Sequence, residues 1–107
     1  PKGRVAGLVT ATVGGLERMQ HAAKLEVLVD ANCRGQGIGR ALMEACCAWA
    51  DAEPSIEKLS LSVFADNEPA IGLYQSLGFL EEGRRLREYR MSDGSYRDDV
   101  LMYRFCV

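Results

Sequence analysis

Histidine is nearly absent from this chain: His21 is the only one in 107 residues. The four cysteines include no pair at metal-ligand spacing, so we expect no metal site. Cys46 and Cys47 fall within a helical pattern, where a reduced thiol behaves as a small apolar residue. Cys33 and Cys106 are isolated. Reduced, structural cysteines predict a cytoplasmic protein.

The chain also lacks an excess of either charge and a long apolar run. The net charge is -2, so the chain lacks the excess of positive charge that is typical of nucleic-acid-binding proteins. No apolar stretch approaches the roughly 20 residues of a membrane span, and no signal peptide opens the chain. We therefore predict neither nucleic-acid nor membrane partners. The hydrophobic share of 48% is typical of a soluble protein and predicts a single domain over residues 1–107.

Apolar periodicity predicts an alternating order of strands and helices. The second strand shows the clearest alternation, because Leu25, Val27 and Val29 share one face and Glu26 lies on the other. The expected elements are strand Val5–Val13, strand Lys24–Asp30, a helix opened by Arg34–Arg40 and ended at Glu53-Pro54, a strand through Leu59, Leu61 and Val63, a helix from Asn67 to Gly78, and two strands after Phe79 joined at Ser92–Ser95.

Local residue choices support both helices. The first keeps one apolar face, formed by Ile38, Leu42, Cys46 and Trp49 with Ala45 alongside. In the second, Asn67 can cap the N-terminus, Pro69 fits the first turn and Gly78 supplies a left-handed stop. Ala70, Leu73, Tyr74 and Leu77 form its apolar stripe.

The strand–helix–strand unit from Lys24 to Phe64 implies a parallel pair with a right-handed crossover. The closing strands form an antiparallel hairpin. The sequence thus predicts an α/β fold with a mixed, mostly antiparallel sheet, a central parallel strand pair and flanking helices.

Three glycines (Gly35, Gly37 and Gly39) lie within five residues, between the second strand and the first helix. Such a loop can turn backbone N–H groups toward one point, and the helix adds the positive end of its dipole. This arrangement binds phosphate or pyrophosphate. The P-loop pattern fails because no lysine follows Gly39, and the dinucleotide fingerprint fails because Arg40 stands where its third glycine belongs. The alternative is a tight turn without a ligand.

Arg34, Gly37 and Gly39 fit the pattern Arg/Gln-x-x-Gly-x-Gly/Ala. Further along the chain, the segment Asn67–Phe79 fits a second pattern, N-x-x-A-x-x-L-Y-x-x-x-G-F. On these two motifs the chain resembles the GNAT acetyltransferases over nearly its whole length. The resemblance implies acetyl transfer from acetyl-CoA to a primary amine by direct attack in a ternary complex. The strand and helices that usually precede Val5 in the family are absent. This leaves open a piece of a longer chain or a form completed by another subunit, and a homodimer covering the edge near Val5.

The resemblance also implies which residues bind acetyl-CoA. The backbone of Val27 and Val29 would pair with the pantetheine arm, in a gap between the second and third strands. Asn67 would hydrogen-bond the same arm, although its capping role is sufficient by itself. Arg34 and Arg40 would meet phosphate oxygens, or remain surface charges. The backbone N–H groups expected at the pyrophosphate are those of Gln36, Gly37, Ile38, Gly39 and Arg40.

Two residues are candidates for proton transfer. Glu26 is a candidate general base, with a surface ion pair to a residue such as Lys24 as the equal alternative. Tyr74 matches the family tyrosine that protonates the leaving thiolate; a core tyrosine is the alternative. Asp98 and Asp99 are weaker candidates for the base and could instead attract a cationic acceptor. An acyl-cysteine route through Cys33 is disfavoured, because no histidine accompanies it.

Two rival functions follow from the same residues. One is a sensor or structural module that binds an acyl-CoA without turnover. The other is a nucleotide-binding α/β domain of another class, which predicts stronger stabilisation by ATP or NAD than by CoA. The acceptor amine cannot be derived from the sequence, and small amines, amino acids, aminoglycosides and protein N-termini stay open.

Overall fold

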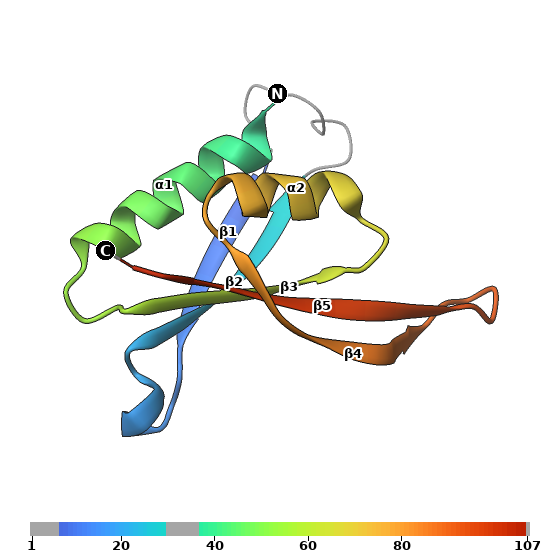
Figure 1. Cartoon of the computed structure of the whole chain (residues 1–107). Helices are drawn as coiled ribbons and strands as arrows, with labels where there is room; N and C mark the ends of the chain where they lie inside the picture. The colour runs from blue at the N-terminus through green and yellow to red at the C-terminus, as the bar shows by residue number, and fades with distance from the viewer. Residues whose placement is uncertain (1–6, 30–36, 107) are drawn as a thin grey trace. The chain divides into compact units, whose positions relative to one another are not determined.

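A computed structural model describes residues 7–29 and 37–106, apart from the side chains of residues 7, 28 and 29. The order of elements agrees with the sequence prediction (Figure 1). They are β1 Gly7–Val13, the short 3-10 helix η1 Glu17–Met19, β2 Ala22–Val29, α1 Ile38–Ala52, β3 Lys58–Phe64, α2 Glu68–Ser76, β4 Leu80–Arg90 and β5 Tyr96–Phe105. Val5 and Asp30, the predicted outer ends of the first two strands, lie outside the described residues.

The strands form one five-stranded sheet in the order β1-β2-β3-β5-β4. β1 and β2 are antiparallel, as are β4 and β5, while β2 and β3 form the parallel pair joined through α1. The predicted mixed sheet is therefore confirmed. The chain divides into two compact units, one reaching Leu59 and including the last residues from Phe105, the other comprising Ser60–Arg104. The expectation of a single domain over residues 1–107 stays a prediction.

In the first unit, α1 packs against β1 and β2. The strand register places Val9 opposite Val27 and Ala11 opposite Leu25, so these four residues share a face of the ribbon. Ala23 and Leu25 are fully or almost fully buried, as alternation predicts. The remaining core residues of this unit are Met43, Cys47, Ala50, Ile56 and Leu59.

The predicted apolar face of α1 is wrong in one respect. The buried residues of the helix are Met43, Cys47 and Ala50, whereas Trp49 is 47% exposed. The apolar arc of α1 is wide, and periodicity alone does not tell which part of the arc rests on the core. The stripe that contains Leu42, Cys46 and Trp49 instead borders a groove beside β1.

The second unit contains α2 and the β4–β5 hairpin. Leu61, Val63, Phe79, Val100 and Met102 form its core, and Tyr74 from α2 adds to it. The signals that predicted α2 are confirmed: the Asn67 side chain accepts a hydrogen bond from the N–H of Ala70 at 3.3 Å, and Gly78 has φ of 94°.

The hairpin turn is confirmed by its hydrogen bonds. Gly94 has φ of 88°, the Met91 N–H donates to the Ser95 carbonyl at 2.8 Å, and Asp93 Oδ1 accepts from the Ser95 N–H at 2.9 Å. β4 is a strand despite its many arginines, because its side chains are largely exposed and Arg84 and Arg85 pair with Glu81 and Glu88.

Candidate functional site

Gly37 is the residue from which α1 begins. It is the N-cap, with φ of 74° in the left-handed region, and its carbonyl accepts the Ala41 N–H at 3.0 Å. A Cβ built at Gly37 would meet nothing within 4 Å, and the first turn of α1 contains no acidic residue. The first N–H groups of a helix have no acceptor inside the helix. Ile38, Gly39 and Arg40 therefore start a positively polarised terminus with open space at Gly37, which suits an anion.

Two residues predicted for this loop, Arg34 and Gln36, lie outside the described residues, as does Cys33. Arg40 lies on the first turn of α1, where its guanidinium is 3.8 Å from Glu44. The two side chains are 50% and 55% exposed, so this ion pair contributes less than about 1 kcal/mol.

Glu26 and Val27 lie on opposite faces of β2, as predicted. Val27 is half-buried, while Glu26 is exposed and lies opposite Thr10 of β1. Among the described residues, no hydrogen bond or ion pair engages Glu26, so the alternative of an ion pair with Lys24 is not realised. Val29 belongs to β2 through its backbone.

Tyr74 is only 8% exposed, and its ring centroid lies 6.1 Å from that of Phe79. Burial raises the pKa of the Tyr74 phenol above its ordinary value of 10.0. No hydrogen bond joins the Tyr74 hydroxyl to another described residue. Among the described residues, every side-chain N or O atom that is fully buried has a hydrogen-bond partner. The phenol is therefore protonated at neutral pH and its hydroxyl is available to a ligand.

The weaker candidates for the base, Asp98 and Asp99, lie next to each other on β5. Asp98 Oδ1 accepts the backbone N–H of Arg87 at 2.8 Å, which supports an irregularity in β4 where Arg87 adopts φ of 51°. Asp99 is 4% exposed and lies opposite Arg85 in the hairpin. Asn67 serves as the cap of α2. Of the two serines in β3, Ser60 is half-buried and Ser62 is exposed.

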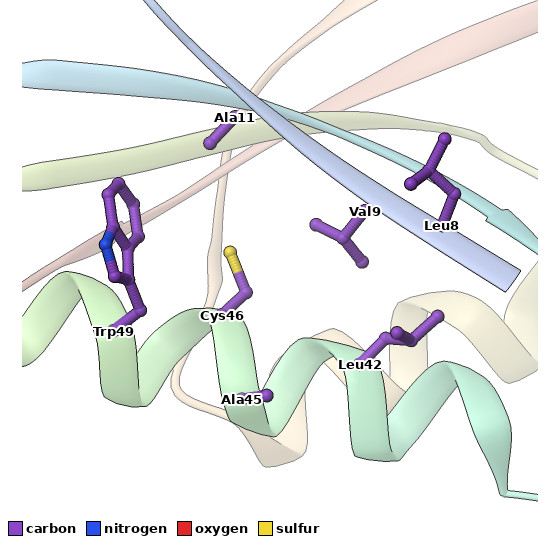
Figure 2. Close-up of a pocket in the computed structure, with 7 residues that line it drawn as sticks. All are labelled: Leu8, Val9, Ala11, Leu42, Ala45, Cys46 and Trp49. Atoms are coloured by element: carbon purple, nitrogen blue, oxygen red, sulfur yellow. The ribbon is translucent and has the colours of Figure 1, made fainter.

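A groove between β1 and α1 was not predicted (Figure 2). Its volume is about 460 Å³, and its lining residues are Leu8, Val9, Ala11, Leu42, Ala45, Cys46 and Trp49. Figure 2 shows Cys46 and Trp49 rising from α1 toward β1, with Val9 pointing back toward the helix. Burial raises the pKa of the Cys46 thiol, and the neighbouring Cys47 and Cys106 add to this shift. The signal available in the sequence was that α1 has two apolar stripes. Met43, Cys47 and Ala50 are buried in the core, so the stripe of Leu42, Cys46 and Trp49 is left to line the groove.

The predicted site residues divide between the two units. Glu26, Val27 and the Gly37–Arg40 turn belong to the first, whereas Asn67, Tyr74, Asp98 and Asp99 belong to the second. In residues 7–29 and 37–106, no three His, Cys, Asp or Glu side chains are grouped so that they could hold a metal ion. None of the helices in these ranges is both long and apolar enough to cross a bilayer.

Comparison with known proteins gives one consistent result. Residues 2–79 match the model of the acetyltransferase (GNAT) family. L-amino acid N-acetyltransferase AaaT of Escherichia coli is 33% identical over 102 residues, covering 95% of this chain and 62% of the relative. The ribosomal protein bS18-alanine N-acetyltransferase of Escherichia coli is 36% identical over 84 residues, covering 78% of this chain and 55% of the relative.

A solved structure agrees with these sequence relatives. The GNAT-family acetyltransferase of Streptococcus pneumoniae superposes with a TM-score of 0.91 at 29% identity, covering 100% of this chain and 63% of that one. The chain thus spans 55% to 63% of the length of these three relatives. The glycine turn at the start of α1 and the α2 segment both lie within the residues that the family model matches. This chain belongs to the GNAT family of acetyltransferases.

Proposed function

We propose that this protein transfers the acetyl group of acetyl-CoA to a primary amine, as an acyl-CoA N-acyltransferase. The observation that carries the proposal is the start of α1: a left-handed Gly37 after β2, with open space above it and no carboxylate in the first turn. The amides of Gly37, Ile38, Gly39 and Arg40, with Gln36 before them, hold the pyrophosphate. Arg34 and Arg40 contact phosphate oxygens, and Asn67 with the backbone of Val27 and Val29 lines the pantetheine arm.

In the proposed mechanism the amine attacks the thioester directly within a ternary complex. Glu26 removes a proton from the ammonium form of the acceptor, directly or through water, because only the neutral amine has a lone pair to donate. The nitrogen bonds to the carbonyl carbon and forms a tetrahedral intermediate. The carbon–sulfur bond then breaks and the nitrogen releases its second proton to solvent, which leaves the neutral amide. The CoA thiolate takes the proton of the Tyr74 hydroxyl, and the tyrosinate recovers a proton from solvent. Because burial raises the pKa of Tyr74, the phenol enters the step protonated.

The acceptor class is tested with a panel of amines. Two relatives are named for acetylation of L-amino acids and of an alanine in a ribosomal protein, which favours an α-amino group as the acceptor. The experiment measures CoA release from acetyl-CoA by the intact protein with amino acids, N-terminal peptides, polyamines and aminoglycosides. Turnover with at least one amine supports the proposal. Tight CoA binding without turnover on any amine would favour the non-catalytic sensor.

We further propose a cytoplasmic homodimer that covers β1. In the strand order β1 is terminal, and an exposed strand edge offers unpaired N–H and C=O groups to another chain. Leu8 on this strand is 48% exposed, which adds an apolar contact at the edge. Light scattering coupled to size-exclusion chromatography tests this proposal: a mass near twice 11.8 kDa supports it, and a monomer at all concentrations contradicts it.

A further inference from the structure

The C-terminal end of α2 is capped by a side chain from β5. Arg104, which is partly buried, donates a hydrogen bond from Nε to the carbonyl oxygen of Leu77 at 3.0 Å. Leu77 is the C-cap residue of α2. The last carbonyls of a helix have no donor inside the helix, and a cation there also meets the negative end of the dipole. Arg104 therefore holds the end of α2 through both a hydrogen bond and its charge.

The capped turn is directly bonded to Tyr74. The carbonyl oxygen of Tyr74 accepts the N–H groups of Leu77 and Phe79, each at 3.0 Å. Between them Gly78 turns the chain with φ of 94°, and a Cβ on this residue would lie 3.6 Å from Arg104 Nε. Phe79 is 1% exposed and its ring packs near the Tyr74 ring. Arg104 is thus connected to the Tyr74 backbone and ring through the turn formed by Leu77, Gly78 and Phe79.

We propose that Arg104 is a positioning residue for Tyr74: by fixing the last turn of α2, it sets where the phenol hydroxyl stands relative to the leaving thiolate. This inference rests on the proposed function, in which Tyr74 is the proton donor. Arg104 itself touches no reacting atom in this scheme. A displacement of about 1 Å at a reacting group can cost on the order of 100-fold in rate, so a loosened turn should reduce turnover well before it unfolds the protein.

The experiment is a double-mutant cycle on the full chain. Arg104→Gln removes the charged cap, and it is measured both alone and together with Tyr74→Phe. We expect Arg104→Gln to lower kcat by about 10-fold with KM for acetyl-CoA nearly unchanged, because only the Tyr74 hydroxyl, the proton donor, is displaced. In the Tyr74→Phe background the same change should alter kcat by less than about twofold, since residues acting as one unit are not additive.

Arg85→Gln is the matched control, because Arg85 is an exposed arginine of the same hairpin whose ion-pair partner, Glu88, lies on the same strand β4. It should leave kcat unchanged. Arg104→Lys retains the charge without the planar Nε–H donor, and we expect it to restore part of the loss. It also serves as the second variant if Arg104→Gln fails to fold. Equal losses of kcat from Arg104→Gln in both backgrounds would overturn the proposal.

A spectroscopic measurement separates this inference from the proposed function. Tyrosinate absorbance is titrated in the protein with and without Tyr74→Phe, so that the difference isolates Tyr74. Arg104→Gln should shift this titration toward the ordinary tyrosine pKa, because a loosened turn admits water to the buried ring. If Tyr74→Phe keeps full activity while this shift occurs, the proton-donor role fails and the catalytic importance of Arg104 fails with it, although the shift still shows that Arg104 fixes the surroundings of the Tyr74 ring. If the Tyr74 titration were unchanged and the effects of the two substitutions on kcat were additive, Arg104 would not position Tyr74, and the proposed function would be unaffected.

Discussion

At the scale of single residues, burial gives Tyr74 two uses. Its ring packs near Phe79 and completes the core of the second unit. The same burial raises its pKa, and the hydroxyl is left without a hydrogen bond to any described residue. A phenol that stays protonated and available is what a leaving thiolate requires. Core packing and the raised pKa of the phenol therefore come from one cause, the low exposure of the ring.

The first prediction concerns stability at high pH. Because the folded pKa of Tyr74 is raised, the folded state retains a proton that the unfolded state loses near its ordinary pKa of 10.0. The contribution to folding stability is complete below that pH and is lost as pH rises through the folded pKa. Urea unfolding across this range should show a steeper loss for the wild type than for Tyr74→Phe. The exposed Tyr89→Phe serves as the control. Parallel stability curves for wild type and Tyr74→Phe would contradict the effect of burial.

The second prediction concerns Glu26. Replacing it by Gln removes the proposed base while conserving size, so kcat/KM should fall by about 100-fold. Steady-state kinetics with the amine as the varied substrate measures this kcat/KM. Lys24→Gln, an exposed change two residues away on the same face of β2, should leave kcat/KM within about twofold. An active Glu26→Gln variant would place the base elsewhere.

At the scale of elements, short-range chemistry fixes α2 more firmly than α1. The N-cap Asn67, an early proline and Gly78 determine where α2 begins and ends, and each acts within a few residues. For this reason the sequence was sufficient to predict α2. The buried face of α1 was mispredicted, because the choice between its two apolar stripes depends on what packs against the helix. The groove beside β1 was missed for the same reason.

The third prediction tests the cap of α2. Asn67→Ala removes the acceptor of the Ala70 N–H and should lower the free energy of unfolding by about 1 kcal/mol. Asn67→Asp keeps a side-chain oxygen at the same position and should lose much less. Urea denaturation of the three proteins measures the difference. If alanine and aspartate variants were equally stable, the hydrogen bond would not stabilise the helix.

At the scale of the whole molecule, the order of elements along the chain, the mixed sheet and the family could be predicted, because period-two alternation, a glycine turn and the α2 segment are all local patterns. The functional details that depend on long-range contacts could not. Asp98 was weighed as a catalytic group, but it supports the backbone of Arg87 where the hairpin register shifts. The Arg104 cap joins residues 27 positions apart in the chain. Neither contact leaves a periodic signal in the sequence.

The account depends most on the binding of CoA at the start of α1. The direct measurement is calorimetric titration of CoA into the wild type, Gly37→Ala and Gly94→Ala. Both glycines have positive φ and open space around a built Cβ, so both substitutions strain the backbone similarly. Only Gly37 lies at the proposed pyrophosphate-binding site. We predict that Gly37→Ala weakens CoA binding by about 10-fold or more, equivalent to about 1.4 kcal/mol, while Gly94→Ala binds like the wild type. No binding by the wild type, or equal affinities in all three proteins, would contradict the account.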